Sequence, residues 1–157
     1  MNRNTEPVLV TDFDGTQKWL LDGKLHRIDG PALITPNGRE EWYQQGNGPA
    51  ITGPNGEEGW YEQGRIHRLD GPAITHPDGF EAWYKNGVAH RDGAPSVTQA
   101  DGYEEWHQNG RYHREDGPAV TRQDGTKEWY LRGLRHRVDG PAIIRIDGSE
   151  EWWLHGS

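Results

Sequence analysis

One seven-residue motif in this chain combines three side chains that could do chemistry. It reads HRxDGPA and occurs at residues 26–32, 67–73, 113–119 and 136–142. A histidine can serve as a general base, an aspartate can orient that histidine, and an arginine can hold an anion. The same residues could instead shape a loop, because aspartate accepts backbone N–H groups in turns, glycine allows a bend and proline blocks further strand pairing. The motif is therefore either a repeated reactive site or a structural element.

The distribution of the motif favours the structural role. A catalytic cluster needs one unique set of residues, whereas this set recurs at regular intervals. Residues 46–50 read GNGPA and lack the histidine and arginine, and residues 90–97 read HRDGAPSV with aspartate and glycine shifted by one position. We therefore predict that the chain is not an enzyme and has no catalytic residue. The histidines and aspartates to which we assign structural roles are His67, Asp70, His113, Asp116, His136 and Asp139.

The elements around the motif repeat with a period of 23 residues. Seven tryptophans each follow a glycine by four residues, with one shorter interval of 18 in the series. That glycine comes after Asp or Asn, a pair that supplies the positive φ angles of tight hairpin turns. β-forming residues flank the turn, and a second glycine after each tryptophan marks the return turn, as in WYKNG at 83–87. These tryptophans, to which we assign a structural role, are Trp19, Trp42, Trp60, Trp83, Trp106, Trp129 and Trp152.

These patterns predict an all-β fold, an elongated single-layer antiparallel meander of about seven repeated β-hairpins. Helix should be almost absent, because no segment has the apolar spacing of an amphipathic helix. In such an array each unit buries its surface against its neighbours. We predict a single repeat domain over residues 1–157. Its hairpin repeats are expected at about residues 7–23, 24–46, 47–64, 65–87, 88–110, 111–133 and 134–157.

The tryptophan and the residue after it should point to opposite faces of the sheet, since side chains alternate along a strand. We expect the invariant tryptophan to lie in the packed interior and the variable follower on a half-exposed face that could bind a partner. The glutamates before tryptophan, including Glu41 and Glu128, are expected to form a solvated stripe balanced by arginines. The candidate binding residues are Tyr43, Tyr61, Tyr84, His107, Tyr130 and Trp153, joined by the loop arginines Arg68, Arg91 and Arg114 as an alternative anion site.

The composition limits the chemistry further. The formal net charge is −8, so the surface repels nucleic-acid phosphates and anionic lipids and favours a basic protein as partner. There is no cysteine, and the histidines, spaced by about 9.6 Å per two-stranded unit, are too far apart to share a metal ion. We predict no metal, no cofactor, no direct nucleic-acid partner and no membrane insertion. The N-terminal residues MNRNTEPVLV contain no apolar signal segment, which predicts a cytoplasmic protein.

The repeats resemble the MORN family, and more closely its bacterial and viral variant repeats, which also occur in antitoxin-like proteins. The resemblance rests on the period near 23, the N-G turn after an aromatic pair, a nearby histidine and the D-G hairpin turn, and it covers about residues 7–154. An arginine follows the histidine where the family usually has glycine, and the inserted D-G-P-A is not part of the common motif. The family likeness implies one extended antiparallel sheet used for binding rather than catalysis.

We therefore expect a protein-binding repeat module, of the kind found among small antitoxin-like or phage anti-defence inhibitors, that acts by occupying a partner. If phage-encoded, it would act in the host cytoplasm. The alternative is capture of a small ligand, a nucleotide or a glycan, by aromatic, arginine and histidine side chains between repeats. The pattern breaks at Gly46–Pro49, at Val88–Val97 and at His107, and such breaks are where functional sites are expected. The last residues, EWWLHGS, either cap the sheet or join a second copy in a homodimer through the sheet ends.

Overall fold

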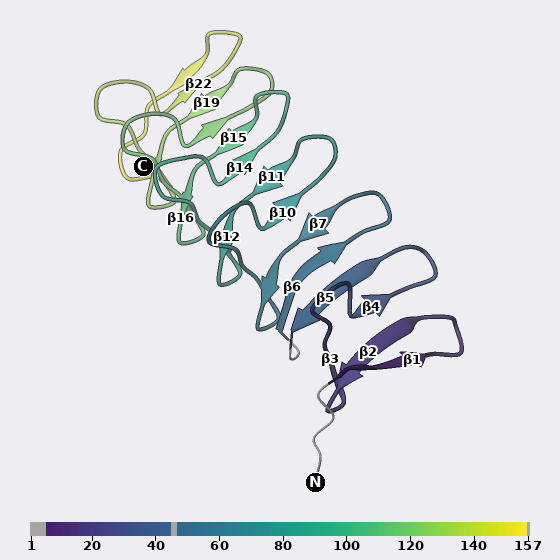
Figure 1. The fold of residues 1–157 in the computed structure, drawn as a ribbon. Coiled ribbons are helices and arrows are strands. Elements are labelled where there is room, and N and C mark those ends of the chain that lie inside the picture. The colour runs from purple at the N-terminus through teal and green to yellow at the C-terminus, as the bar shows by residue number, and fades with distance from the viewer. Residues whose placement is uncertain (1–5, 45–46, 157) are drawn as a thin grey trace.

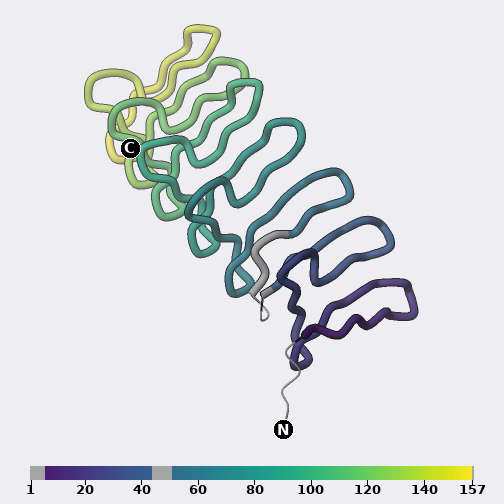
Figure 2. Tube along the Cα trace, in the orientation of Figure 1, coloured from purple at the N-terminus to yellow at the C-terminus, as the bar shows by residue number. Residues whose placement is uncertain are grey.

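The computed structural model describes residues 6–44 and 47–156. These residues form 23 β-strands and no helix. The strands stack into an elongated array with the two chain termini at opposite ends (Figure 1). Its loops succeed one another in chain order along the long axis, so neighbours in space are neighbours in sequence (Figure 2). No helix in this part of the chain is long and apolar enough to cross a membrane.

Fifteen strands form one antiparallel sheet that follows the chain as a meander, and four further strand pairs form two-stranded ladders beside it. The predicted all-β, elongated antiparallel meander of repeated hairpins is therefore confirmed. The large sheet contains β1 (Val8–Thr11), β2 (Gln17–Leu21), β3 (Lys24–Leu25), β4 (Leu33–Ile34), β5 (Glu40–Gln44), β6 (Asn47–Thr52), β7 (Glu58–Gly59), β10 (Ile74–Thr75), β11 (Glu81–Ala82), β14 (Val97–Thr98), β15 (Glu104–Glu105), β18 (Val120–Thr121), β19 (Lys127–Glu128), β22 (Ile143–Ile144) and β23 (Glu150–Glu151). The small ladders pair β8 (Tyr61–Glu62) with β9 (Arg65–Ile66), β12 (Tyr84–Lys85) with β13 (Val88–Ala89), β16 (His107–Gln108) with β17 (Arg111–Tyr112), and β20 (Tyr130–Leu131) with β21 (Leu134–Arg135).

A tryptophan joins the large sheet to each small ladder. The N–H of Trp60 donates to the carbonyl of Ala73 at 2.8 Å, and the carbonyl of Trp60 accepts from the N–H of His67 at 2.9 Å. Equivalent bonds recur at Trp83, Trp106 and Trp129. The HRxDGPA motif is thus the connector that carries the chain from a return hairpin back to the next strand of the large sheet.

Glycine turns reverse the chain at both ends of each hairpin. At the D-G turns the glycine is the left-handed residue, as at Gly79 with a φ of 88°. At the return turns two successive residues have positive φ, as at Asn86 with 53° and Gly87 with 84°, which is the backbone of a type I′ hairpin turn. The turns inferred from the sequence are therefore turns in the structure.

The most buried row of the sheet consists of the alanines of the motif, which are 0% exposed at Ala32, Ala73, Ala119 and Ala142. The tryptophans before the loops are half-buried, and Trp152 is 67% exposed. The expectation that the indole rings form the packed interior is therefore wrong. A single sheet has no second layer to enclose a large side chain. The side chains that are most completely buried between the strands are therefore as short as a methyl group.

The short connector at Gly46–Pro49 produces a simple hairpin. Strands β5 and β6 pair directly, with Trp42 opposite Ala50 and a register shift between Trp42 and Gln44. Because this connector lacks the histidine and arginine of the motif, one continuous hairpin replaces the return ladder and loop of the other repeats. Residues 45–46 lie outside the described residues.

Candidate functional site

Each loop arginine lies over the indole ring of the tryptophan eight residues earlier. The Cζ atom of Arg68 is 3.9 Å from the ring centroid of Trp60. A guanidinium at this distance is attracted by the negative face of the ring. The same contact recurs for Arg27 on Trp19 at 4.2 Å, Arg91 on Trp83 at 3.7 Å, Arg114 on Trp106 at 3.8 Å and Arg137 on Trp129 at 4.1 Å. The arginines predicted as an anion site therefore lie on the tryptophans.

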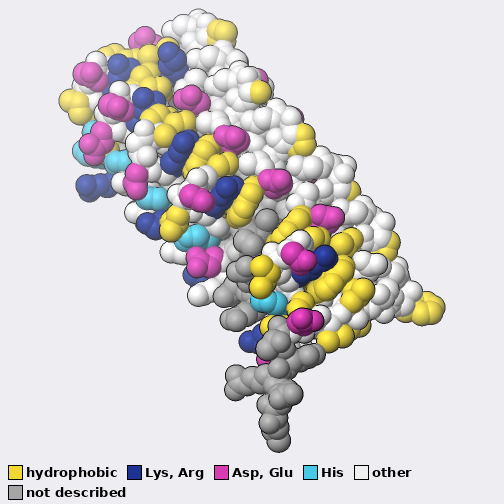
Figure 3. All heavy atoms as spheres, viewed as in Figure 1, with side chains coloured by type: hydrophobic (Ala, Val, Ile, Leu, Met, Phe, Trp, Pro, Cys, Tyr) yellow, Lys and Arg dark blue, Asp and Glu magenta, His cyan; other side chains and the backbone are white. Residues whose placement is uncertain are grey.

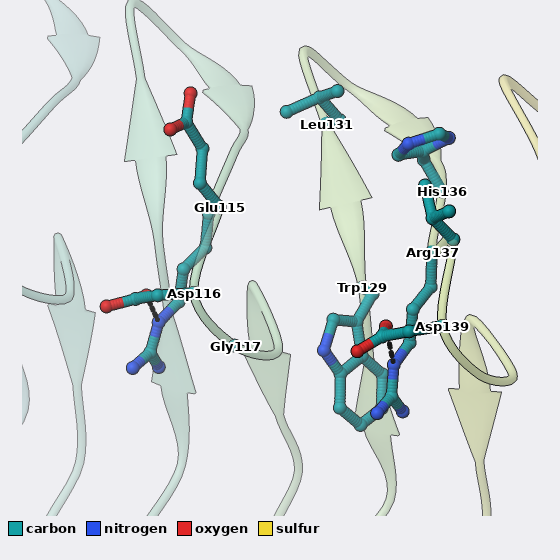
Figure 4. A pocket seen from close by; sticks show the side chains of 10 residues that line it. Glu115, Asp116, Gly117, Trp129, Leu131, His136, Arg137 and Asp139 are labelled. Carbon is teal, nitrogen blue, oxygen red and sulfur yellow. Dashed lines mark hydrogen bonds and ion pairs between the residues drawn. The ribbon is translucent and has the colours of Figure 1, made fainter.

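The aspartate and proline of the loop hold the guanidinium in place. Arg68 donates from Nε to Oδ1 of Asp70 at 3.1 Å and from Nη1 to the carbonyl of Pro72 at 3.2 Å. Figure 4 shows the equivalent ion pair of Arg137 with Asp139, beside the indole that this arginine covers. Acceptance of this hydrogen bond from arginine lowers the pKa of the loop aspartates Asp29, Asp70 and Asp116 below the ordinary value.

The glycine of the motif makes room for the guanidinium. A Cβ atom at Gly71 would lie 2.9 Å from Cζ of Arg68, and the φ of Gly71 lies outside the left-handed region. This glycine is therefore needed because it has no side chain, and not because the chain bends there as the sequence pattern predicted. The fourth loop keeps the stacking by another route: Gly93 has a φ of 70°, Ala94 follows it, and Arg91 still covers its tryptophan.

The histidine of the motif links its loop to the next repeat. Nδ1 of His67 accepts the N–H of Asn86 at 3.0 Å, and Nδ1 of His113 accepts the N–H of Arg132 at 3.1 Å. A ring nitrogen that accepts carries no proton, so a neutral ring in this position holds its proton on Nε2. His90 and His136 accept in the same way from Asn109 and His155. We call these contacts of histidine, arginine, aspartate and glycine the loop clamp.

Two of the glutamates before the tryptophans, Glu41 and Glu128, are buried in hydrogen bonds, which corrects the expectation of a solvated stripe at these positions; Glu105 and Glu151 are half-buried. Glu41 and Glu128 are 8% and 4% exposed. Glu128 accepts from Nε of Arg122 at 2.7 Å and from the hydroxyl of Tyr130 at 2.9 Å. Residues two positions apart on a strand share a face, which places the glutamate beside the aromatic follower. The arginine that completes the burial of Glu128 lies directly after β18, at the start of the D-G turn, and sequence spacing gave no sign of it.

The residues after the tryptophans take part in packing. Tyr43 donates its hydroxyl to Glu41 at 2.7 Å, and burial, reinforced by this bond, raises the pKa of Tyr43 to about 12. Trp153 donates Nε1 to Glu151 at 3.0 Å. These candidate binding residues are therefore side chains with partners in the protein. All six are half-buried: Tyr43, Tyr61, Tyr84, His107, Tyr130 and Trp153.

Two breaks in the repeat, His107 and the arm Val88–Val97, contact each other. Ser96 stands where the other loops have alanine, and His107 where tyrosine is usual. Nδ1 of His107 lies 2.8 Å from Oγ of Ser96, and Nε2 lies 3.9 Å from Glu105. Burial lowers the pKa of His107, and the charge of Glu105 opposes that shift. Because Ser96 is 0% exposed, its hydroxyl is enclosed by the protein and offers no accessible nucleophile.

Grooves lie between successive clamped loops. One has a volume of about 570 Å³ and is lined by Arg114, Trp129 and Arg137 among others (Figure 4). Another has a volume of about 450 Å³ and is lined by residues at the corresponding positions, 46 residues earlier in the chain. Each groove brings together one indole ring, two guanidiniums and the carboxylates of two loops.

The x residue of each loop projects outward. Ile28, Leu69 and Val138 are 78%, 77% and 79% exposed. The side chains of the loop aspartates are also exposed, with 87% at Asp70, because only one carboxylate oxygen faces the arginine. Figure 3 shows one face of the array, on which apolar, acidic, basic and histidine side chains recur along the long axis. We call the x residues and loop aspartates the loop-tip row; its members are Ile28, Asp29, Leu69, Asp70, Glu115, Asp116, Val138 and Asp139.

Comparisons with known proteins give no family: no protein-family model matches the chain, and no curated protein matches it. Within residues 6–44 and 47–156, no group of three His, Cys, Asp or Glu side chains is arranged to hold a metal ion. The assignment of a site therefore rests on the geometry of the loops, and the MORN-like resemblance stays a prediction.

Filling the space at a motif glycine should open the loop clamp. We expect Gly71→Ala to lower the free energy of unfolding by about 1 kcal/mol, because the added methyl group displaces the guanidinium of Arg68 from Trp60. Equilibrium unfolding in urea measures this change. In an Arg68→Ala background the same glycine substitution should cost little, since no guanidinium remains to be displaced. Strictly additive effects of the two substitutions would contradict the loop clamp.

Ser96 and His107 should be energetically coupled. We expect Ser96→Ala and His107→Tyr each to destabilise the protein, whereas the double variant, which restores the usual Ala–Tyr pair, should recover about 1 kcal/mol. Folding lowers the pKa of His107, so as pH falls below the ordinary value of 6.5 the unfolded chain takes up its proton first and stability declines. The double variant should lack that part of the decline. Urea unfolding above and below this pH measures both effects. If the effects of the two single substitutions on the free energy of unfolding simply added in the double variant, the coupling would be disproved.

Proposed function

We propose that this protein is a non-enzymatic, protein-binding repeat module that acts by occupying a basic partner protein. The observation that carries the proposal is the contrast within the motif between inner and outer side chains. Histidine, arginine and glycine are engaged in the loop clamp, as at His67, Arg68 and Gly71. The x side chain and one aspartate oxygen face solvent. The clamp fixes the loop, so the x residue can change, from Ile to Leu, Glu or Val, without changing the loop.

The loop-tip row suits a basic partner. Its carboxylates are exposed on a chain whose formal net charge is −8. Charge complementarity speeds encounter and selects among partners, while apolar side chains between the charges supply contact area. A specific interface buries about 800 Å² on each partner. A long edge of regularly spaced, rigid loops offers such an area without a pocket.

The proposed biological role is inhibition, of the antitoxin-like or phage anti-defence type, in the cytoplasm of the producing cell or its host. A rigid binder inhibits when it covers the surface that its partner needs. The loop clamp supports binding over catalysis, because the motif histidines His67 and His113 already accept backbone N–H groups. The MORN-like resemblance, which implies binding, points the same way.

Removing the apolar members of the loop-tip row should weaken partner binding. We expect Ile28→Ser, Leu69→Ser and Val138→Ser together to raise Kd by about tenfold or more, because each apolar side chain buried in an interface contributes on the order of 1 kcal/mol. Affinity purification from the native cell followed by mass spectrometry identifies the partner, and biolayer interferometry measures Kd. The melting temperature should not change, because these side chains are 77–79% exposed.

The matched control removes exposed apolar side chains from the D-G turns. Phe13 and Ile146 are 110% and 76% exposed, and Phe13→Ser with Ile146→Ser should leave Kd unchanged. If the control variant raised Kd as much as the loop-tip variant, the interface would not be at the loop-tip row. If the wild-type protein captured no stoichiometric partner, the proposal would be lost.

The repeated grooves support small-ligand capture as a second candidate function. Their volumes are about 570 and 450 Å³, and the same positions of successive repeats line them. Indole, guanidinium and carboxylate groups together suit a nucleotide or a glycan, through stacking and hydrogen bonding. Equivalent grooves would give more than one site per chain.

Calorimetric titration with nucleotides and glycans tests this second function. We expect at least two sites of similar affinity per chain, because the grooves at Trp83 and Trp129 are equivalent in position. Trp129→Phe should weaken one site and leave the site at Trp83 intact, since the smaller ring stacks on less of the ligand. Loss of both sites together, or no saturable binding by the wild-type protein, would rule out groove binding.

A further inference from the structure

A third pocket, of about 370 Å³, lies between two return turns and is lined by Gln108, Asn109, Arg111, His113 and Arg132. All five side chains are polar, and none is a carboxylate. The stem of Arg111 crosses to the next repeat, since a Cβ atom added at Gly133 would lie 3.6 Å from its Cβ. The hydrogen bond from the N–H of Arg132 to Nδ1 of His113 fixes the second turn against the first. The pocket is thus a built junction between two repeats.

The two arginines of this pocket have no ion-pair partner in the described part of the chain. The surrounding arginines do: Arg114 with Asp116, Arg122 and Arg135 with Glu128, Arg137 with Asp139, and Arg145 with Glu151. One acidic side chain contacts a residue of the pocket: Oε1 of Glu115 lies 3.6 Å from Nε2 of His113. Both Arg111 and Arg132 are exposed. Two arginines without an ion-pair partner therefore line a cavity whose other lining residues are two amides and a histidine.

The equivalent junction two repeats earlier lacks this charge. The corresponding residues, 46 positions before, are Glu62, Gln63, Arg65, His67 and Asn86. There the carboxylate of Glu62 lies 3.4 Å from Nε2 of His67. At these five lining positions, glutamine in place of glutamate and arginine in place of asparagine make the later junction more positive by two charges. Glu115, which contacts His113 and stands where the earlier junction has Leu69, offsets one of them. The return turn has the same left-handed residue in both junctions, since φ is 53° at Asn86 and 54° at Arg132.

We propose that the pocket between Arg111 and Arg132 binds a phosphate dianion, either free or as the terminal phosphate of a small molecule. Two guanidiniums match the charge of the dianion, and their planar sets of donors suit its oxygens. The amides of Gln108 and Asn109 add further donors. Carboxylates elsewhere in the chain repel an anion in this pocket only weakly, because salt at 0.1 M screens exposed charges beyond about 10 Å. This site is separate from the loop-tip row, and its ligand is independent of the partner protein.

Calorimetric titration of the full chain with inorganic phosphate and with glycerol 3-phosphate tests the proposal. We expect one site per chain and a loss of about tenfold or more in affinity for Arg111→Gln and for Arg132→Gln, because each removes charge-assisted hydrogen bonds. Arg65→Gln, at the junction that retains Glu62, is the matched control and should leave affinity unchanged. Tighter binding of glycerol 3-phosphate than of phosphate assigns the site to a phosphate monoester, and the reverse order assigns it to free phosphate.

A gain-of-function variant completes the test. Glu62→Gln with Asn86→Arg should create a second site, so the stoichiometry should rise from one phosphate per chain to two. Circular dichroism and the melting temperature check that every variant keeps the fold. The proposal is overturned if the wild-type chain binds neither probe saturably, or if both arginine variants bind as tightly as the wild type.

Discussion

Each clamped loop packs a guanidinium against an indole ring, and the course of the chain on both sides follows from that contact. At Arg68 the guanidinium also meets its own aspartate, a proline carbonyl and the open side of Gly71. The alanine after the proline then enters the large sheet, where it is fully buried. Because the loop histidine accepts from the next return turn, each clamped loop also positions the following repeat. Each repeat is therefore held in place by contacts with its neighbours along the array.

Only 31% of the residues in this chain are hydrophobic. Polar contacts therefore stabilise much of the fold, a role that an apolar core has in proteins with two packed layers. Tryptophan and glutamate adjoin on a strand and so face opposite sides of the sheet. One side is held by guanidinium–indole stacking. The other is held by carboxylates such as Glu128, which tolerate burial because arginine and tyrosine satisfy their oxygens.

Departures from the repeat come in two kinds. Some are compensated within the protein: Ser96 and His107 depart together and hydrogen-bond each other, and Gly93 bends the one loop that carries alanine in the glycine position. The change at Gln108 and Arg132 is different, because it removes an acid and adds a cation without an internal partner. A charge that no side chain of the protein neutralises is available to bind a ligand of opposite charge.

The sequence by itself determined the turns, the 23-residue period and the all-β meander, because each depends on local rules: the φ angles of D-G and N-G pairs and the alternation of side chains. It also indicated that HRxDGPA builds loops. Only the tertiary structure decided which atoms the polar side chains meet. Spacing alone does not say that Arg68 reaches back to Trp60, that Glu128 is buried, or that Arg111 and Arg132 line one pocket. Those contacts depend on strand register and side-chain direction between segments that the chain brings together only when it folds.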